Sequence, residues 1–326
     1  MQDRAGVIAG AAFMVGGMAI IGLIDNFVKE IAAEAGLWQF HLTRSAMVCA
    51  AIPVIAWGLG VSLIPRRKLG VLLRSIFGAL SMAVYFGALG VMPIAQVGAG
   101  LFTAPIFVLV LSVVFFGQGV GVVRVIAAAV GFAGVLLVLQ PDLRALELAV
   151  VLPMAAGLTW ALTALTTRHL CEGEHVLTLL FGFFATLGVV GALGLWAMAV
   201  GLGDGQSFAT RGWVAPTGAF WFWTGIQAAG SLLAVSMLTR AYQLGETSYI
   251  APFEYSFLVF AGAWGFLIND EVLGPGALLG VGLIMLAGGV IAWRSGDRTE
   301  KEATVPDGEA QGGAGAEEQG APKVGL

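Results

Sequence analysis

The chain has 326 residues, of which 58% are hydrophobic and only 11% charged, and its formal net charge is -4. Soluble domains carry about 25% charged residues. This composition, with 48 glycines and 9 tryptophans, therefore excludes an ordinary soluble globule. The lack of a basic excess also excludes a nucleic-acid-binding protein.

Long apolar segments dominate the chain, and a membrane-crossing helix needs about 20 mostly apolar residues. We predict an all-α integral membrane protein with ten transmembrane helices, since ten such segments are present. They are 6–28, 37–59, 71–92, 95–116, 120–140, 148–168, 176–200, 219–243, 247–268 and 274–293. The first is too long for a cleaved signal peptide, so we expect it to remain in the protein. Residues 295–326 are rich in Gly, Ala, Glu and Gln and predict a disordered cytoplasmic tail.

The basic residues indicate an orientation. With the N-terminus in the cytoplasm, twelve Lys and Arg residues fall on the cytoplasmic side and four on the outer side. This asymmetry agrees with the positive-inside rule. We therefore predict a multi-pass protein of the inner (plasma) membrane with both termini cytoplasmic.

A shift of 153 residues aligns two similar blocks. Residues 88–95 precede an apolar segment that ends in Phe116-Gly117-Gln118, and residues 241–248 precede one that ends in Ile268-Asn269-Asp270-Glu271. We predict two five-helix repeats, at 1–141 and 142–294. Because five is odd, the second repeat enters the membrane inverted, which is typical of transporters that work by alternating access.

Motifs of catalysis and of metal or nucleotide binding are not found in the sequence. His41, His169 and His175 lack ligand spacing, and Cys49 and Cys171 lie in apolar runs as small buried hydrophobes do. We predict no catalytic residues, no metal and no cofactor, and hence a protein that is not an enzyme.

Two charged residues lie within the predicted helices near the outer side. Asp25 is close to the outer end of the first segment, and Arg44 is about two turns into the second from the same side. Charged groups at membrane depth are costly and usually face a cavity or one another. The pair is open to two interpretations, a structural ion pair or a gate that contacts the ligand.

The deepest carboxylate is Glu254, about seven residues into the ninth segment. It has three interpretations: a group that takes up a proton or meets a cationic ligand, a static salt bridge, or an interfacial residue. Arg240 and Arg168, near the inner ends of neighbouring segments, are the candidate partners of the salt bridge, and we name Arg240 with Asp25 and Arg44 as gate or ion-pair residues.

Prolines interrupt the fourth and ninth segments, which occupy matching places in the two halves. Pro105 and Pro252 remove backbone hydrogen bonds and kink these helices, so we expect the two to line a midplane cavity. Each aromatic or polar residue on the expected cavity helices is by itself more often an ordinary packing residue or an interfacial belt residue. As a group they predict a substrate-binding cavity lined by Tyr85, Gln96, Phe102, Trp160, Gln227, Phe253, Glu254 and Tyr255.

Several blocks of the first half resemble one transporter family. Residues 73–78 (LRSIFG), 85–89 (YFGAL), 93–95 (PIA), 104–107 (APIF) and 131–135 (GFAGV) are similar to the EamA-type pattern of the drug/metabolite transporters, and the resemblance covers 5–293. It implies a ten-helix bundle with both ends cytoplasmic and a cavity walled by helices 1, 3, 4, 6, 8 and 9, typically for export of small metabolites. Arg44 falls where the family often places an Arg in helix 2, whereas Gln118 stands where the family often has Glu.

The leading hypothesis is a secondary active or facilitative transporter that exports small amphipathic metabolites such as amino acids, amines or carboxylates. Alternatives are an uptake carrier for a vitamin-like or aromatic compound, and a lipid-handling membrane protein. The expected partners are a small-molecule substrate and the lipid bilayer, with a proton or counter-ion and a homodimer left open.

Overall fold

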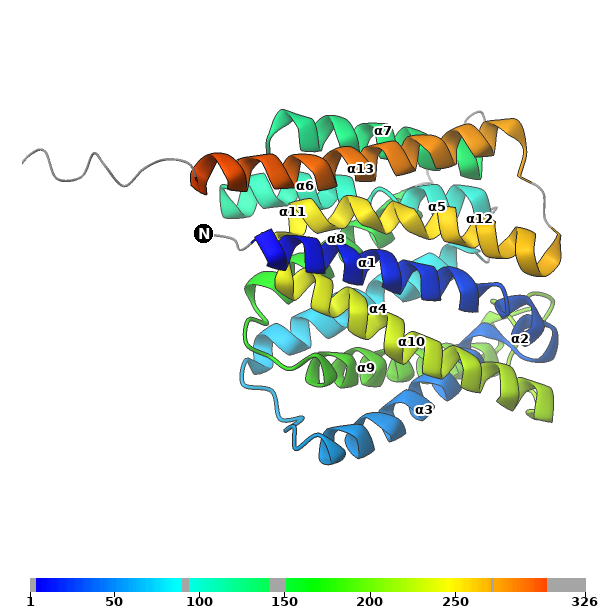
Figure 1. Cartoon of the computed structure of the whole chain (residues 1–326). Coiled ribbons are helices and arrows are strands. Elements are labelled where there is room, and N and C mark those ends of the chain that lie inside the picture. Colours follow the sequence, from blue (N-terminus) through cyan, green and yellow to red (C-terminus); the bar gives the residue numbers. More distant parts are fainter. Residues whose placement is uncertain (1–3, 90–93, 141–150, 271–272, 304–326) are drawn as a thin grey trace, which may run out of the picture.

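The structure is a computed structural model that describes residues 4–89, 94–140, 151–270 and 273–303, and over these ranges it contains helices and no strands. The helices run roughly side by side as one bundle (Figure 1). Their bounds are α1 Arg4–Asp25, α2 Val28–Glu34, α3 Leu37–Gly58, α4 Lys68–Leu89, α5 Ile94–Leu101, α6 Ala104–Phe116, α7 Val122–Leu139, α8 Val151–His169, α9 Val176–Ala197, η3 Met198–Leu202, α10 Gly218–Leu244, α11 Thr247–Ile250, η4 Ala251–Tyr255, α12 Ser256–Asn269 and α13 Pro275–Ala303.

Eight helical stretches of the described chain are long and apolar enough to cross a membrane. They are Gly6–Glu34, Leu37–Gly58, Lys68–Ala88, Val97–Phe116, Val122–Leu139, Val176–Leu202, Gly218–Leu244 and Thr247–Ile268. The shorter Pro275–Ile291 is also apolar. Helix α8 follows the predicted segment 148–168 but is not among the eight, because its described residues include Arg168 and His169 in the last turn as well as several threonines. The protein is therefore a helical integral membrane protein.

Two of these stretches are irregular within their length. The fourth predicted segment stops at Leu101 and resumes at Ala104, and the Thr103 hydroxyl donates to the Gly100 carbonyl at 2.5 Å. The ninth is α11 followed by the 3-10 turn η4 and then α12. Pro105 lies in the first turn of α6 and Pro252 in η4, where a missing N–H costs little. The expected irregularities are thus a turn at residues 102–103 in the fourth segment and a 3-10 turn in the ninth.

Small residues let some helices approach closely. At the crossing of α7 and α13, a Cβ added to Gly134 would lie 2.6 Å from the Gly280 carbonyl oxygen. The two backbones therefore touch, as is common for helix pairs in membranes. Helices α7 and α13 form one side of the bundle, seen at the top of Figure 1.

The ends of the bundle differ. The N-terminus and the C-terminal end of α13 lie on the same face (left in Figure 1), which we call the terminal face. On the opposite face, the 203–217 loop is bound to the start of α3. Gln39 Nε2 donates to the Val214 carbonyl at 2.7 Å, and the Val214 N–H donates back to Gln39 Oε1 at 2.8 Å. Trp38 Nε1 also donates to the Ala209 carbonyl at 2.9 Å.

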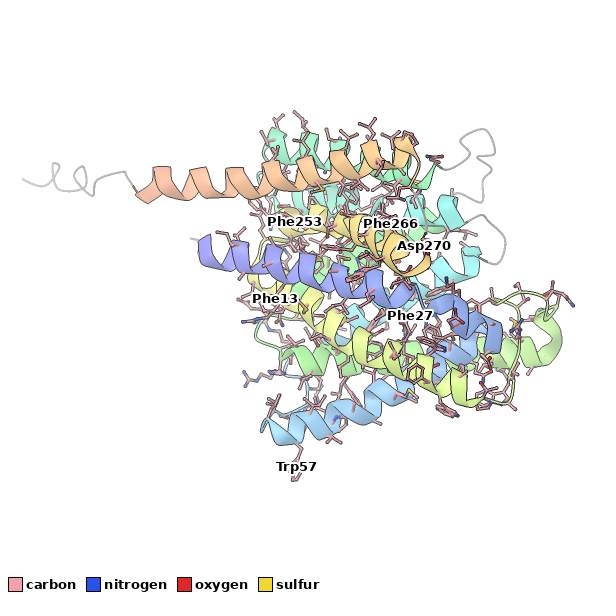
Figure 2. All side chains as sticks on the ribbon, turned by 45° about the vertical axis from the view of Figure 1, so that its right-hand side comes forward. Phe13, Phe27, Trp57, Phe253, Phe266 and Asp270 are labelled. Atoms are coloured by element: carbon pink, nitrogen blue, oxygen red, sulfur yellow. The ribbon has the colours of Figure 1, made fainter. Side chains whose placement is uncertain are left out.

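Large apolar side chains cover the outside of the bundle, as lipid contact requires. Trp57, near the end of α3, is 86% exposed and projects away from the other helices (Figure 2). Helix α13 continues to Ala303, so the predicted disordered stretch 295–326 begins inside a helix. Arg, Glu and Lys at its end are good helix formers. The rest of that stretch, 304–326, lies outside the described residues.

Candidate substrate-binding site

A central cavity of about 210 Å³ lies between the two halves of the chain. Six of the residues predicted from the sequence line it, each from a different helix or helix break. They are Asp25 of α1, Arg44 of α3, Tyr85 of α4, Phe102 of the α5–α6 break, Trp160 of α8 and Glu254 of η4. Residues more than 200 positions apart in the chain thus meet at one space.

Glu254 is held by hydrogen bonds rather than by a salt bridge. Its carboxylate oxygen Oε1 accepts from Trp160 Nε1 at 2.9 Å and from the Tyr242 hydroxyl. The side chain is 3% exposed. The expected cations are elsewhere: Arg240 is exposed and donates to Gln243, and Arg168 donates to the Gln243 carbonyl. The static salt bridge predicted as one alternative is therefore not formed.

Arg240 fails to reach Glu254 for a simple geometric reason. Residues two apart on an α-helix point in directions about 200° apart. Because Tyr242 of α10 faces Glu254, Arg240 faces away from it, toward a larger space at the terminal face.

Asp25 and Arg44 also do not form an ion pair. Arg44 Nη2 is 3.1 Å from His41 Nδ1, its Nη1 is 3.4 Å from the Ser231 hydroxyl, and its guanidinium lies 4.7 Å from the centre of the Phe40 ring. Both charged groups line the cavity. Both therefore remain available to a ligand, and the structural ion pair is not realised.

Three further predicted residues lie outside the lining. Gln227 is buried and donates from Nε2 to the Ile24 carbonyl at 2.6 Å, beside Asp25. Tyr255 is buried against Gly131 of α7, and Phe253 packs toward α13. The side chain of Gln96 lies outside the described part of the structure.

The wall of the cavity is mainly aromatic. Phe86, Phe183, Phe184 and Phe257 join the three predicted aromatic residues, and the polar groups come from Asp25, Arg44, Ser231 and Glu254. An apolar wall with a few convergent polar groups is the usual form of a small-molecule site. The arrangement suits a solute with an apolar body and charged ends.

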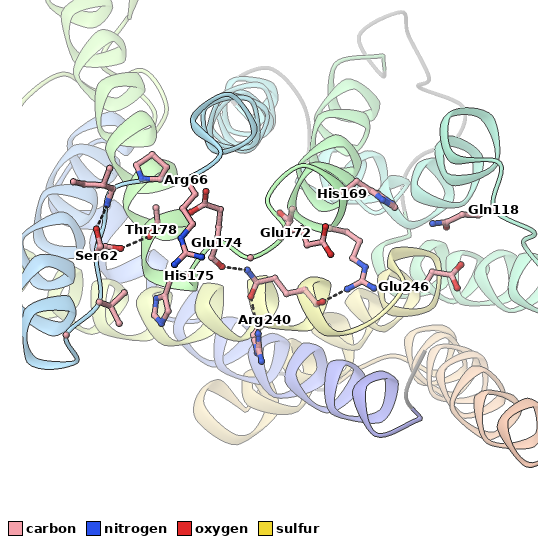
Figure 3. A pocket seen from close by; sticks show the side chains of 18 residues that line it. Ser62, Arg66, Gln118, His169, Glu172, Glu174, His175, Thr178, Arg240 and Glu246 are labelled. Atoms are coloured by element: carbon pink, nitrogen blue, oxygen red, sulfur yellow. Dashed lines mark hydrogen bonds between the residues drawn. The ribbon is translucent and has the colours of Figure 1, made fainter. Parts of the chain in front are cut away.

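A second and larger space, the vestibule, opens at the terminal face. Its volume is about 1120 Å³, and Figure 3 shows its lining. Charged side chains surround it: Arg66, Arg168, Glu172, Glu174, Arg240 and Glu246. Gln118, the residue that departs from the family pattern, also lies in this wall. The vestibule is polar where the central cavity is aromatic.

A polar layer lies between the vestibule and the central cavity, and none of its residues is among those predicted for the substrate site. It contains Arg74, Thr163, Thr167, Thr239 and Tyr242. Arg74 lies seven residues into α4, so its depth in an apolar segment was a usable signal. Nothing in the sequence shows that the threonines of α8 and α10 meet it.

The two cysteines pack among apolar residues. Cys171, in the turn between α8 and α9, is fully buried with Val71 and Leu179. Burial raises the pKa of its thiol to about 11. Little thiolate is present at neutral pH, which makes Cys171 a poor nucleophile.

Comparisons with known proteins agree with this architecture. Residues 8–140 match the EamA-like transporter family. A riboflavin transporter of Vibrio cholerae is 27% identical over 302 residues, which cover 88% of this chain and 95% of that protein. The pseudopaline exporter CntI of Pseudomonas aeruginosa is 26% identical, with 86% of this chain and 92% of that protein covered.

A riboflavin transporter of Rhizobium johnstonii is 30% identical over 185 residues, and this match spans 56% of either chain. A crystal structure of a protein superimposes with a TM-score of 0.72 at 15% identity, covering 89% of this chain and 98% of the other. That likeness shows the shared fold. The first half of the chain thus matches the EamA-like transporter family, and the two relatives that align along most of the chain are named a transporter and an exporter.

Proposed function

We propose that the protein is a secondary or facilitative transporter that exports small amphipathic solutes carrying a carboxylate and an amino group, by alternating access. The observation that carries this proposal is the central cavity, where one guanidinium, two carboxylates and an aromatic wall face a shared space. A transporter must release its solute as well as bind it, and a small site with groups of both charge signs meets both needs.

The packing of the helices supports ten spans in two inverted five-helix repeats, 1–141 and 142–294. The most extensive contacts are α1 with α10, α4 with α8, α3 with α9 and α7 with α13. If the first through fifth spans correspond to the sixth through tenth, this correspondence converts the pair α1–α10 into the pair α4–α8. It maps the pairs α3–α9 and α7–α13 each onto itself. A two-fold axis in the membrane plane has this property, and it gives inward-open and outward-open states of similar energy.

The breaks in two spans support the same correspondence. Phe102, in the α5–α6 break, is 153 residues before Tyr255, the last residue of η4. Irregular backbone at membrane depth is tolerated where it borders protein or a cavity. Both breaks supply lining residues to the central cavity. We infer that the terminal face is cytoplasmic and that solute enters from the vestibule.

The charges of the cavity favour a zwitterionic solute. Arg44 suits a carboxylate, because a guanidinium donates to both oxygens, while Asp25 and Glu254 suit an ammonium group. The cavity of about 210 Å³ is smaller than the ~300–1,000 Å³ usual for drug-sized ligands. This size fits an aromatic amino acid in the present conformation. The relative named as an exporter supports the proposed direction.

A second candidate is uptake of a vitamin-like aromatic compound. Three relatives are named riboflavin transporters, and one of them aligns along nearly its full length. The aromatic wall is consistent with a flat ring, but such a solute requires a wider cavity than the present one.

The test uses purified protein in liposomes with four probes: L-phenylalanine, 3-phenylpropionate, phenethylamine and riboflavin. We expect L-phenylalanine to exchange faster than in protein-free vesicles. The Arg44→Gln variant should lose about tenfold or more of that rate, because a hydrogen bond to a charged group contributes ~1.5–3 kcal/mol. Lys68→Gln, which removes an exposed cation from the first turn of α4, is the matched control.

Two results would contradict the proposal. Exchange of riboflavin without exchange of L-phenylalanine would favour the second candidate. Exchange of none of the four probes by protein that unfolds cooperatively would reject the proposed solute class.

A further inference from the structure

Arg74 of α4 is a buried cation without a counter-ion. It is 4% exposed. Its Nε donates to the Thr167 hydroxyl, its Nη1 to the Leu179 carbonyl and its Nη2 to the Thr239 hydroxyl, each at 2.9 Å. The ion pairs of the described residues involve other arginines, Arg67 with Glu172 and Arg124 with Glu246.

The neutral partners of Arg74 leave part of its bonding capacity unused. A guanidinium has five N–H donors, and the three hydrogen bonds account for three of them. An uncompensated charge in a low-dielectric interior is costly, and at membrane depth such a residue is a candidate for function. An anion that arrives at Arg74 would find two free donors and no competing carboxylate of the described chain.

Arg74 also lies on the route that a solute must take. An inner hollow of about 20 Å³ is lined by Arg74, Thr163, Thr167, Thr239 and Tyr242, with Trp160, Val235 and Leu238. Thr167 also lines the vestibule, and Trp160 also lines the central cavity. The hollow is therefore a constriction between the two larger spaces. Its present volume holds about one water molecule.

We propose that Arg74 is an inner anion-binding station that receives the carboxylate of the solute as the constriction opens. The solute's carboxylate is then held in turn by Arg74 at the constriction and by Arg44 in the central cavity. Because the two guanidinium groups follow one another along the route, the carboxylate has a charged hydrogen-bond donor at each position. This inference rests on the proposed function and adds to it that the transported class carries a carboxylate.

The experiment compares Arg74→Gln with the wild type in liposomes, using L-phenylalanine and phenethylamine as probes that differ by the carboxylate. We expect the initial rate for L-phenylalanine to fall about tenfold or more, which corresponds to ~1.4 kcal/mol in the barrier. The rate for phenethylamine should stay within about twofold. Equilibrium binding of L-phenylalanine in detergent should also change little, because Arg44 still occupies the central cavity.

Two controls separate this role from structural support. Thr239→Val removes one hydrogen-bond partner of Arg74 and keeps its charge, so any effect should be equal for the two probes. Lys68→Gln removes an exposed cation of the same helix and should affect neither. Equal losses of both probes in Arg74→Gln, or full retention of L-phenylalanine exchange, would overturn the proposal.

A second measurement does not depend on transport. Sodium formate should raise the unfolding temperature of the Arg44→Gln protein above that in sodium fluoride at equal ionic strength, because binding to the folded state stabilises it. This difference should vanish in the Arg44→Gln, Arg74→Gln double variant. If both proteins respond alike, Arg74 does not bind carboxylate, whatever the wild type transports.

Discussion

At the scale of single residues, the central cavity places its cationic group, Arg44, and an acidic group, Glu254, at different positions in the wall. Arg44 is held by His41, Ser231 and the face of Phe40, none of which neutralises it. Glu254 accepts hydrogen bonds from Trp160 and Tyr242, which fix its orientation without an ionic partner. The two groups are thus positioned by neutral neighbours, and a zwitterionic solute can form an ion pair with each of them.

Glu254→Gln is predicted to weaken recognition of amines selectively. The amide keeps an oxygen that can accept from Trp160 and Tyr242, so the position should stay ordered while its charge is lost. The exchange rate of phenethylamine should fall about tenfold, and that of 3-phenylpropionate should not fall. Tyr242→Phe, which removes one hydrogen bond and keeps the carboxylate, should have the smaller effect on phenethylamine. An equal fall in the exchange rates of both probes would show that Glu254 supports the fold and does not recognise the charge of the solute.

The sequence allowed several cavity residues to be chosen because a charge or a polar aromatic in an apolar segment is costly. Asp25, Arg44, Trp160 and Glu254 were identified in this way, and they do line one space. Their partners could not be predicted in the same way. Whether Arg240 or Tyr242 faces Glu254 depends on the rotation of α10 about its own axis, and that rotation is set by packing among helices distant in sequence.

At the scale of elements, the broken ninth span is anchored at its start. Arg124 of α7 bonds Glu246 at 2.7 Å and the Ser248 hydroxyl at 2.6 Å, and its guanidinium lies 3.7 Å from the centre of the Tyr249 ring. This fixes α11 against α7. The proline positions indicated interruption of the span, but the length of the 3-10 turn depends on these contacts and was not predictable.

The contact between α7 and α13 gives a prediction on stability. In Gly280→Ala the added Cβ would lie 2.5 Å from the Gly134 carbonyl oxygen, so the helices must separate. Overpacking of this kind costs about 1–3 kcal/mol, and thermal unfolding of the purified protein should show a lower midpoint. Gly282→Ala is the matched control, because nothing lies within 4 Å of the added atom. Equal midpoints for the two variants would contradict close packing at Gly280.

At the scale of the whole molecule, the two ends of the bundle have different chemistry. The terminal face holds the wide vestibule with its charged wall, and at the opposite face the 203–217 loop is hydrogen-bonded to the start of α3. Hydropathy predicts where the apolar segments lie, and eight helical stretches of the described chain are long and apolar enough to cross a membrane. The sequence does not predict which end is open, because under the proposed alternating access both states share one sequence.

The proposed orientation is testable in intact bacterial cells. In a protein lacking Cys49 and Cys171, cysteine at Gln206 of the 203–217 loop should react with a membrane-impermeant maleimide from outside. Cysteine at Glu172 in the wall of the vestibule should react only after the membrane is permeabilised. Both side chains are exposed in the structure, so unequal reaction reports sidedness rather than burial. The reverse pattern would place the termini outside the cell.

The reciprocal bonds between Gln39 and Val214 have a kinetic consequence. Opening toward that side requires the loop to detach from α3, whereas the vestibule is already accessible. We expect the empty protein to rest with its vestibule open. In the proposed export cycle, the solute then binds before the hydrogen bonds between the loop and α3 break. The slow steps of the cycle are then release of the solute and return of the empty protein. Weakening the hydrogen bonds between the loop and α3 should therefore raise the turnover rate without raising the affinity for the solute.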